Sequence, residues 1–152
     1  MNHHDASQDE PAEHLRFWAY LSALEQVTDA DEARLVSEVL TDPDQAMAQS
    51  AILRHLDRGR ATELLRGPAY EPWAASMAQV AGHHSLLTRR LREWSLFRAI
   101  TLKQPWHPDV LLDSSDWLQL KAAATSNTRT IEILAQYGRT KRIRNTARTN
   151  IK

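Results

Sequence analysis

Apolar residues recur every three or four positions along most of the 152-residue chain, and no stretch alternates regularly between apolar and polar residues. This spacing places apolar side chains on one face of an α-helix and argues against strands. Prolines and glycines divide the pattern, because proline favours a first helical turn and glycine a helix end. The predicted helices cover approximately 11–27, 29–40, 43–58, 61–66, 72–81, 85–102, 108–125 (one helix or two), 127–137 and 139–152.

The pattern therefore predicts an all-α protein of about seven to nine short antiparallel helices, because short connections join antiparallel neighbours. These helices form either a compact bundle or a short repeat array. The polar and acidic segment 1–10 lacks apolar periodicity and is predicted to be disordered. Residues 11–152 are predicted to form a single helical domain.

The last fifteen residues, 138–152, combine two stripes on one predicted helix. Ile143, Ala147 and Ile151 form an apolar stripe with a spacing of four residues. The neighbouring stripe is basic and consists of Lys141, Arg144, Arg148 and Lys152. A freely solvated tail has no physical reason to keep an apolar stripe in register. We therefore expect a helix that packs on the C-terminal half of its own chain and leaves its cations to solvent or to a partner.

Three stretches, 42–56, 115–129 and 138–152, align when their small residues are matched. Each has a large apolar residue four positions before an alanine, in the pairs Met47 and Ala51, Leu120 and Ala124, and Ile143 and Ala147. In the last two stretches a cation, Lys121 or Arg144, follows the large residue. This pattern resembles the valine-arginine-x-x-alanine signature of HEAT-like helical repeats. The resemblance covers about the last forty residues and one earlier helix, and it implies stacked helix pairs that present a surface to a protein partner or, in some members, to duplex DNA.

Composition narrows the class of protein further. No apolar run reaches the roughly 18 residues of a membrane span. The N-terminus is polar and acidic, unlike a signal peptide. The chain has no cysteine, and therefore no disulfide and no thiolate metal ligand. We expect a cytoplasmic protein that has neither a membrane partner nor a cofactor.

A formal net charge of zero hides a strong asymmetry along the chain. Residues 1–50 carry eleven Asp or Glu against two Arg, whereas the last fifteen residues carry six Lys or Arg and no acid. These two regions should attract each other, within one molecule or between molecules. Each exposed pair contributes only about 0–1 kcal/mol, so the apolar stripe must supply most of any docking energy.

No known catalytic motif occurs in the sequence. Asp113 and Asp116 are one helical turn apart, but such pairs are usually solvated. The adjacent His83 and His84 would diverge by about 100° on a helix and would not share a metal ion. An enzyme assembled from distant polar residues stays open as a third function.

The five tryptophans divide into two groups. Trp18, Trp73, Trp94 and Trp117 occupy apolar helix positions and are predicted to lie in the core. Trp106 lies in the proline-bounded loop KQPWHP, where it either covers the end of the core or serves as an exposed interaction anchor.

The sequence predicts a non-catalytic helical module that binds a protein partner. Its candidate partner-binding residues are Arg139, Lys141, Arg142, Arg144, Arg148 and Trp106. The alternative is a DNA-associated protein whose C-terminal cations contact phosphates, although the acidic first third would repel a polyanion. No catalytic or metal-binding residue is predicted, and the sequence leaves the partner's identity and the oligomeric state open.

Overall fold

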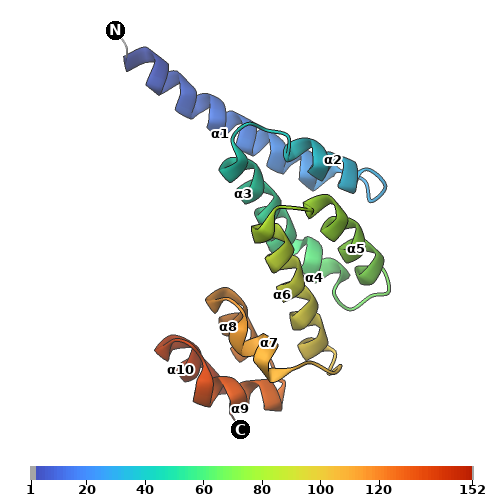
Figure 1. Cartoon of the computed structure of the whole chain (residues 1–152), viewed down its shortest axis with the longest axis vertical. Helices are drawn as coiled ribbons and strands as arrows, with labels where there is room; N and C mark the ends of the chain where they lie inside the picture. The colour runs from blue at the N-terminus through green and yellow to red at the C-terminus, as the bar shows by residue number, and fades with distance from the viewer. Residues whose placement is uncertain (1–2, 152) are drawn as a thin grey trace. The chain divides into compact units, whose positions relative to one another are not determined.

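The computed structural model of the chain describes residues 3–151, with the side chains of residues 12 and 14–151. Every regular element in this part is helical, so the predicted all-α fold is confirmed. Residues 3–151 form nine helices when the single-turn α4 is counted with α3 across the kink that joins them. In chain order the elements are α1 (His3–Gln26), α2 (Glu32–Val39), α3 (Gln45–His55), η1 (Leu56–Arg60), α4 (Ala61–Leu64), α5 (Tyr70–Ala81), α6 (Ser85–Thr101), α7 (Pro108–Asp113), α8 (Asp116–Ala123), α9 (Thr128–Tyr137) and α10 (Lys141–Asn150) (Figure 1).

The chain divides into two compact units, Met1–Leu91 (unit 1) and Arg92–Lys152 (unit 2), and the boundary falls within α6. The sequence predicts a single domain over residues 11–152, and the division into two compact units does not test this prediction. Residues 1 and 2 and the side chains of residues 3–11 and 13 lie outside the described part of the chain. The expected disorder of residues 1–10 therefore also stays a prediction.

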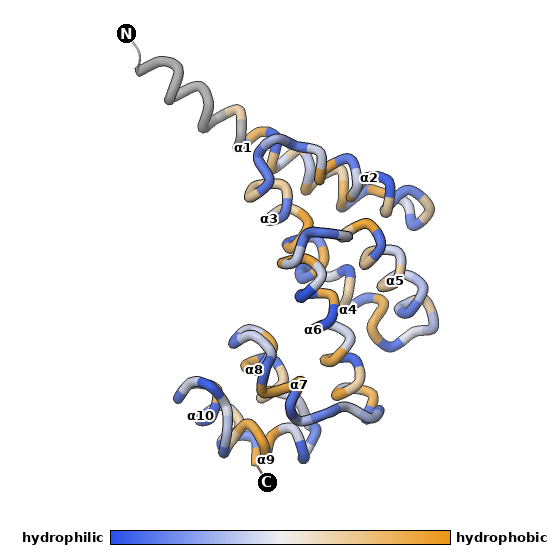
Figure 2. Tube along the Cα trace, in the orientation of Figure 1, coloured by the Kyte–Doolittle hydropathy of each residue, from blue (hydrophilic) through white to orange (hydrophobic). Residues whose placement is uncertain are grey.

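In unit 1, α1 runs beside α2 and α3, and α2 also contacts α5 (Figure 1). Hydrophobic residues recur between hydrophilic ones along these helices, as Figure 2 shows. The small side chains of Ala48 and Ala51 are fully buried in α3, which allows its neighbours to approach closely. The other core residues of unit 1 include Leu24, Val36, Val39, Ile52, Leu56, Tyr70, Met77 and Leu87.

The turn that precedes α3 differs from its predicted form. The helix predicted over 43–58 would have Asp42 as its N-cap, but the side chain of Asp44 accepts the capping hydrogen bond from the Met47 N–H, at 3.1 Å. Asp42 is instead buried and accepts hydrogen bonds from Tyr20 Oη at 2.6 Å and Arg16 Nε at 3.1 Å. Asp42 therefore fastens the turn to α1, which is a long-range role that local spacing does not reveal.

In unit 2, the C-terminal end of α6 and helices α7 to α10 surround one core. Leu96 and Ile100 come from α6, and the remaining buried residues are Leu111, Leu118, Ala122, Ala123, Ile131, Leu134, Ala135, Ile143 and Ala147. Side-chain N-caps begin the last three helices: Ser115 for α8, Asn127 for α9 and Thr140 for α10. These caps satisfy backbone N–H groups that have no partner inside the helix, and they fix where each helix begins. Among the described residues, no helix has the length and low polarity that crossing a lipid bilayer requires.

One of the five tryptophans does not occupy its predicted position. Trp73 and Trp94 are buried and Trp117 packs against the core of unit 2, as expected. Trp18 is 53% exposed on α1, so its predicted core position is wrong. Its ring instead lies beneath the guanidinium of Arg54, 5.4 Å from the ring centroid.

Candidate functional site

Helix α10 is packed on one side and basic on the other. Its stripe residues Ile143 and Ala147 are buried, and the helix contacts α8 and α9. The predicted packing of this helix on the C-terminal half of the chain is therefore confirmed. The third stripe residue, Ile151, is 50% exposed, because α10 ends at Asn150 and Ile151 follows as the C-cap.

The junction between α9 and α10 depends on close packing at Gly138. A Cβ atom at this position would lie 2.6 Å from the Leu134 carbonyl oxygen and 2.7 Å from Ile143 Cγ2. At the other end of the helix, Asn150 Nδ2 donates a hydrogen bond to the Ala123 carbonyl oxygen at 3.0 Å. These contacts hold α10 in place from both ends.

Two of the five predicted C-terminal cations make hydrogen bonds to parts of unit 2 outside α10. Arg139 Nη1 lies 2.7 Å from Asp116 Oδ1, and its Nη2 donates to the carbonyl oxygens of Leu112 at 3.0 Å and Ser114 at 2.6 Å. Arg144 Nη1 donates to the Gly138 carbonyl oxygen at 2.9 Å. Both side chains therefore stabilise the fold, a role that sequence spacing does not predict.

The other three predicted cations form an exposed surface, the basic face of α10, which consists of Lys141, Arg142 and Arg148. Within the described part of the chain none of them pairs with a carboxylate, and only Arg148 has a weak hydrogen bond, to Asn145 Oδ1 at 3.3 Å. Lys152, which the sequence places on the same stripe, lies outside the described residues. The basic face thus carries three cations on a fixed helix.

Trp106 is half-buried rather than bare. Its side chain packs against the core of unit 2, and the Arg129 guanidinium lies over its ring, 5.0 Å from the centroid. This placement agrees with the first of the two predicted roles, covering the end of the core. Its role as an anchor for a partner stays a prediction.

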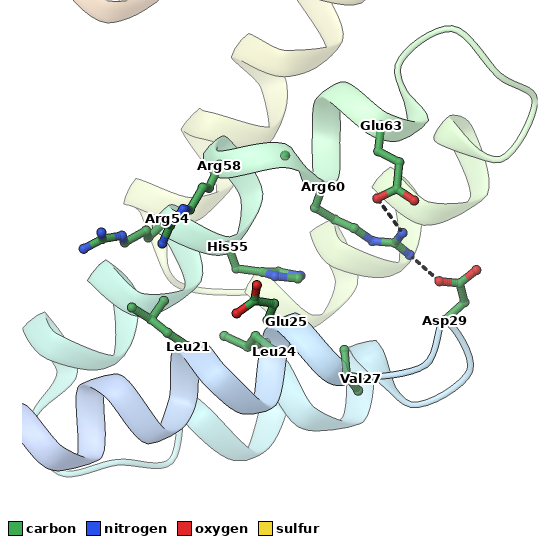
Figure 3. A pocket seen from close by; sticks show the side chains of 11 residues that line it. Leu21, Leu24, Glu25, Val27, Asp29, Arg54, His55, Arg58, Arg60 and Glu63 are labelled. Atoms are coloured by element: carbon green, nitrogen blue, oxygen red, sulfur yellow. Dashed lines mark hydrogen bonds and ion pairs between the residues drawn. The ribbon is translucent and has the colours of Figure 1, made fainter.

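A pocket in unit 1, the α1–α3 pocket, has a volume of about 440 Å³ and lies between α1, α3 and the kink at Gly59. Its apolar side consists of Leu21, Leu24 and Val27, from α1 and the residue after it (Figure 3). Its charged side chains are Arg54, Arg58, Arg60, Glu25, Asp29 and Glu63, and His55 also lines it. Arg60 lies on one side of the pocket together with the two acids that it contacts, Asp29 and Glu63 (Figure 3).

Behind this pocket lies a buried carboxylate that sequence reasoning missed. Glu32, 2% exposed, accepts hydrogen bonds from His55 Nε2 at 2.7 Å, from Arg60 Nη2 at 2.8 Å and from Trp73 Nε1 at 3.0 Å. Burial by itself would raise the pKa of Glu32. The hydrogen bonds from His55, Arg60 and Trp73 outweigh burial and lower the pKa to about 2, so the carboxylate is ionised near neutral pH.

A signal for Glu32 does exist in the sequence. It precedes Val36 by four residues and Val39 by seven, so it belongs to the apolar stripe of α2. A carboxylate at such a position must find partners or be neutralised. The sequence does not show that these partners come from α3, η1 and α5.

Two of the side chains considered above for catalysis or metal binding, Asp116 and His84, have other partners. Asp116 pairs with Arg139, and His84 contacts the Ala81 carbonyl oxygen at 2.9 Å and Gln45 Oε1 at 3.1 Å. No group of three or more His, Cys, Asp or Glu residues suited to a metal ion occurs in the described part of the chain.

Comparison with family models, with curated proteins and with solved structures gives no match to this chain.

Proposed function

We propose that this protein is a non-catalytic helical interaction module that binds an acidic protein surface through the basic face of α10. The observation that carries the proposal is that Lys141, Arg142 and Arg148 have no carboxylate partner among the described residues, although the helix beneath them is firmly packed. Cations held on a rigid element lose less freedom on binding than cations on a mobile tail.

The charge of unit 2 supports an acidic partner. Residues 92–152 contain eleven Lys or Arg and five Asp or Glu, a formal balance of +6. Such an excess speeds the encounter with a partner of opposite charge. The resemblance to HEAT-like repeats also favours a protein partner, and the cysteine-free sequence favours a cytoplasmic setting.

Duplex DNA is the alternative partner, since arginine and lysine also neutralise phosphates. Two features favour protein over DNA. The basic face has only three cations, and residues 1–91 of the same chain have a formal balance of −6, which repels a polyanion.

The test compares a labelled polyglutamate peptide with a labelled DNA duplex of equal charge, by fluorescence anisotropy at two salt concentrations. Replacing Lys141, Arg142 and Arg148 with Gln should weaken peptide binding by about tenfold or more, because three charge pairs of up to about 1 kcal/mol each are lost. A matched control replaces the exposed cations Arg66, Arg92 and Lys103 with Gln, which is the same change in charge.

The control variant should bind the peptide nearly as well as the wild type does. Equal weakening by both variants would show that only overall charge matters and would contradict the proposal. Tighter binding of the duplex, with a steep loss of affinity in salt, would favour the DNA alternative.

A further inference from the structure

The α1–α3 pocket contains charged groups that the fold itself does not use. Arg60 is fully engaged, by Glu32, Asp29 and Glu63. In contrast, Arg58 and Glu25 have no hydrogen bond or ion pair with any residue that the structure describes. In the described part of the chain, Arg54 interacts only with the ring of Trp18, so its N–H groups are available to donate to a ligand.

His55 adds a ring nitrogen that lacks a partner among the described residues. Its side chain is only 10% exposed, lines the pocket, and uses Nε2 to contact Glu32. Because an ionised carboxylate only accepts hydrogen bonds, Nε2 must carry the hydrogen. The other ring nitrogen, Nδ1, has no partner in the described part of the chain and can accept a hydrogen bond from a ligand while the ring is neutral.

The free groups are separated within the pocket. Arg54 and Arg58 lie on the side opposite Arg60, and Glu25 and His55 lie between the two sides (Figure 3). An anionic group would therefore bind beside Arg54 and Arg58, away from the acids at Arg60. Glu25 would repel a ligand that is only an anion, but it would accept hydrogen bonds from hydroxyl groups next to that anion.

The size and the apolar side of the pocket suit a small molecule. A volume of about 440 Å³ falls within the range of roughly 300–1,000 Å³ that is usual for small-ligand sites. Leu21, Leu24 and Val27 would contact the carbon skeleton of such a ligand.

We propose that the α1–α3 pocket binds a small soluble ligand that carries one phosphate or carboxylate group and neighbouring hydroxyl groups. Arg54 and Arg58 bind the anionic group, and Glu25 and Nδ1 of His55 accept hydrogen bonds from the hydroxyl groups. This site lies in unit 1 and does not depend on the function proposed for the basic face of α10.

The experiment is an NMR titration of the full-length ¹⁵N-labelled protein with four probes: glycerol phosphate, glycerate, inorganic phosphate and glycerol. The amide signals of residues 21–29 and 54–60 should shift with glycerol phosphate or with glycerate, and the preferred probe identifies the anionic group. Inorganic phosphate should bind at least about threefold more weakly, and glycerol should cause no shift. Shifts with none of the probes, or shifts confined to other residues, would overturn the proposal.

Two variants test the assigned contacts. Arg58→Gln should weaken binding of the preferred probe by about tenfold, whereas the exposed Arg66→Gln, with the same change in charge, should leave it unchanged. Glu25→Ala should reduce the preference for glycerol phosphate over inorganic phosphate by about threefold, because the hydroxyl acceptor is lost. Equal effects of the two arginine variants, or an unchanged preference in Glu25→Ala, would contradict the assignment.

Discussion

Unit 1 has a formal balance of −6 and unit 2 a balance of +6, and the two units place their charged groups differently. In unit 1, cations reach inward to buried acids: Arg16 to Asp42 at 3.1 Å and Arg60 to Glu32 at 2.8 Å. In unit 2, the cations of α10 that have no carboxylate partner point outward. The first arrangement ties helices together, and the second leaves charge available for a partner.

Buried polar side chains show the same contrast. Glu32 is held by His55, Arg60 and Trp73 from three different elements. In unit 2 the fully buried Gln119 is neutral, and it joins backbone groups: its Nε2 donates to Leu111 and Leu112 carbonyl oxygens at 3.2 and 3.1 Å, and its Oε1 accepts from the Arg139 N–H at 3.0 Å. Glu93 of unit 2 is also buried, and the Ser115 N–H and hydroxyl donate to it at 2.6 and 2.7 Å. Glu32 thus joins three elements of unit 1 through a charged side chain, whereas the neutral Gln119 joins backbone groups of unit 2.

The largest expected effect comes from Glu32→Gln. This change leaves the Arg60 charge without its buried counter-ion, and removing one partner of such a pair costs about 3 kcal/mol of unfolding free energy. Urea denaturation followed by circular dichroism measures it. The control, Glu63→Gln, removes an exposed acid 3.8 Å from Arg60 and should change the stability by less than about 0.5 kcal/mol. Equal effects of the two changes would contradict the central role of Glu32.

Acid should weaken unit 1 through the same carboxylate. The pKa of Glu32 is lowered from 4.5 to about 2 in the folded protein, so its contribution to stability is present above pH 4.5 and is lost as the pH falls toward 2. We expect a loss of roughly 2 kcal/mol over this interval. Urea midpoints measured across the same pH range should fall less steeply in Glu32→Gln than in the wild type. Parallel curves would show that other groups cause the acid sensitivity.

A pair of glycine substitutions compares packing in the two units. Gly138→Ala would force its new Cβ to within 2.6 Å of the Leu134 carbonyl oxygen, and we expect a loss of about 1.5 kcal/mol. Gly59→Ala meets no atom within 4 Å and should be nearly neutral. Thermal melting of both variants tests the difference, and a neutral Gly138→Ala would mean that α9 and α10 can move apart at no cost.

The smallest expected effect is a difference in stability between two arginine variants of unit 2. Arg139→Gln loses hydrogen bonds to Leu112 and Ser114 and an exposed ion pair with Asp116, which together contribute about 1 kcal/mol. Arg148→Gln should leave the melting temperature unchanged, because the only hydrogen bond of Arg148 to a residue that the structure describes is a weak one, to Asn145. A greater loss of stability in Arg148→Gln than in Arg139→Gln would reverse the distinction between structural and exposed cations.

Local patterns predicted much of the helical structure. The spacing of Ile143, Ala147 and Ile151 predicts the apolar stripe of α10, of which Ile143 and Ala147 are buried, and the segment 108–125 is predicted to contain one helix or two. It contains two, α7 and α8, because Ser115 caps a new helix. The width of the buried face of a helix is harder to predict, because it depends on how many other helices pack against it. Trp18 is exposed because the neighbours of α1 cover only part of its circumference.

The candidate sites depended on contacts between residues far apart in the sequence. The cations near the C-terminus were evident, but Arg139 differs from Lys141 only through partners 23 to 27 residues away. The α1–α3 pocket was not predicted, because its lining combines α1, α3 and the residues after the kink. The HEAT-like resemblance stays a prediction.

The most direct test of the contrast between the two units is quantitative capture of partners from the native organism's lysate, combined with thermal melting of the same variants. We expect that replacing Lys141, Arg142 and Arg148 with Gln leaves the melting temperature unchanged but removes a specific protein partner. The matched variant at Arg66, Arg92 and Lys103 should retain that partner. Three results would contradict the claim that the basic face of α10 serves binding rather than stability. These are loss of the partner from both variants, retention of the partner by both, and a large fall in the melting temperature of the α10 variant.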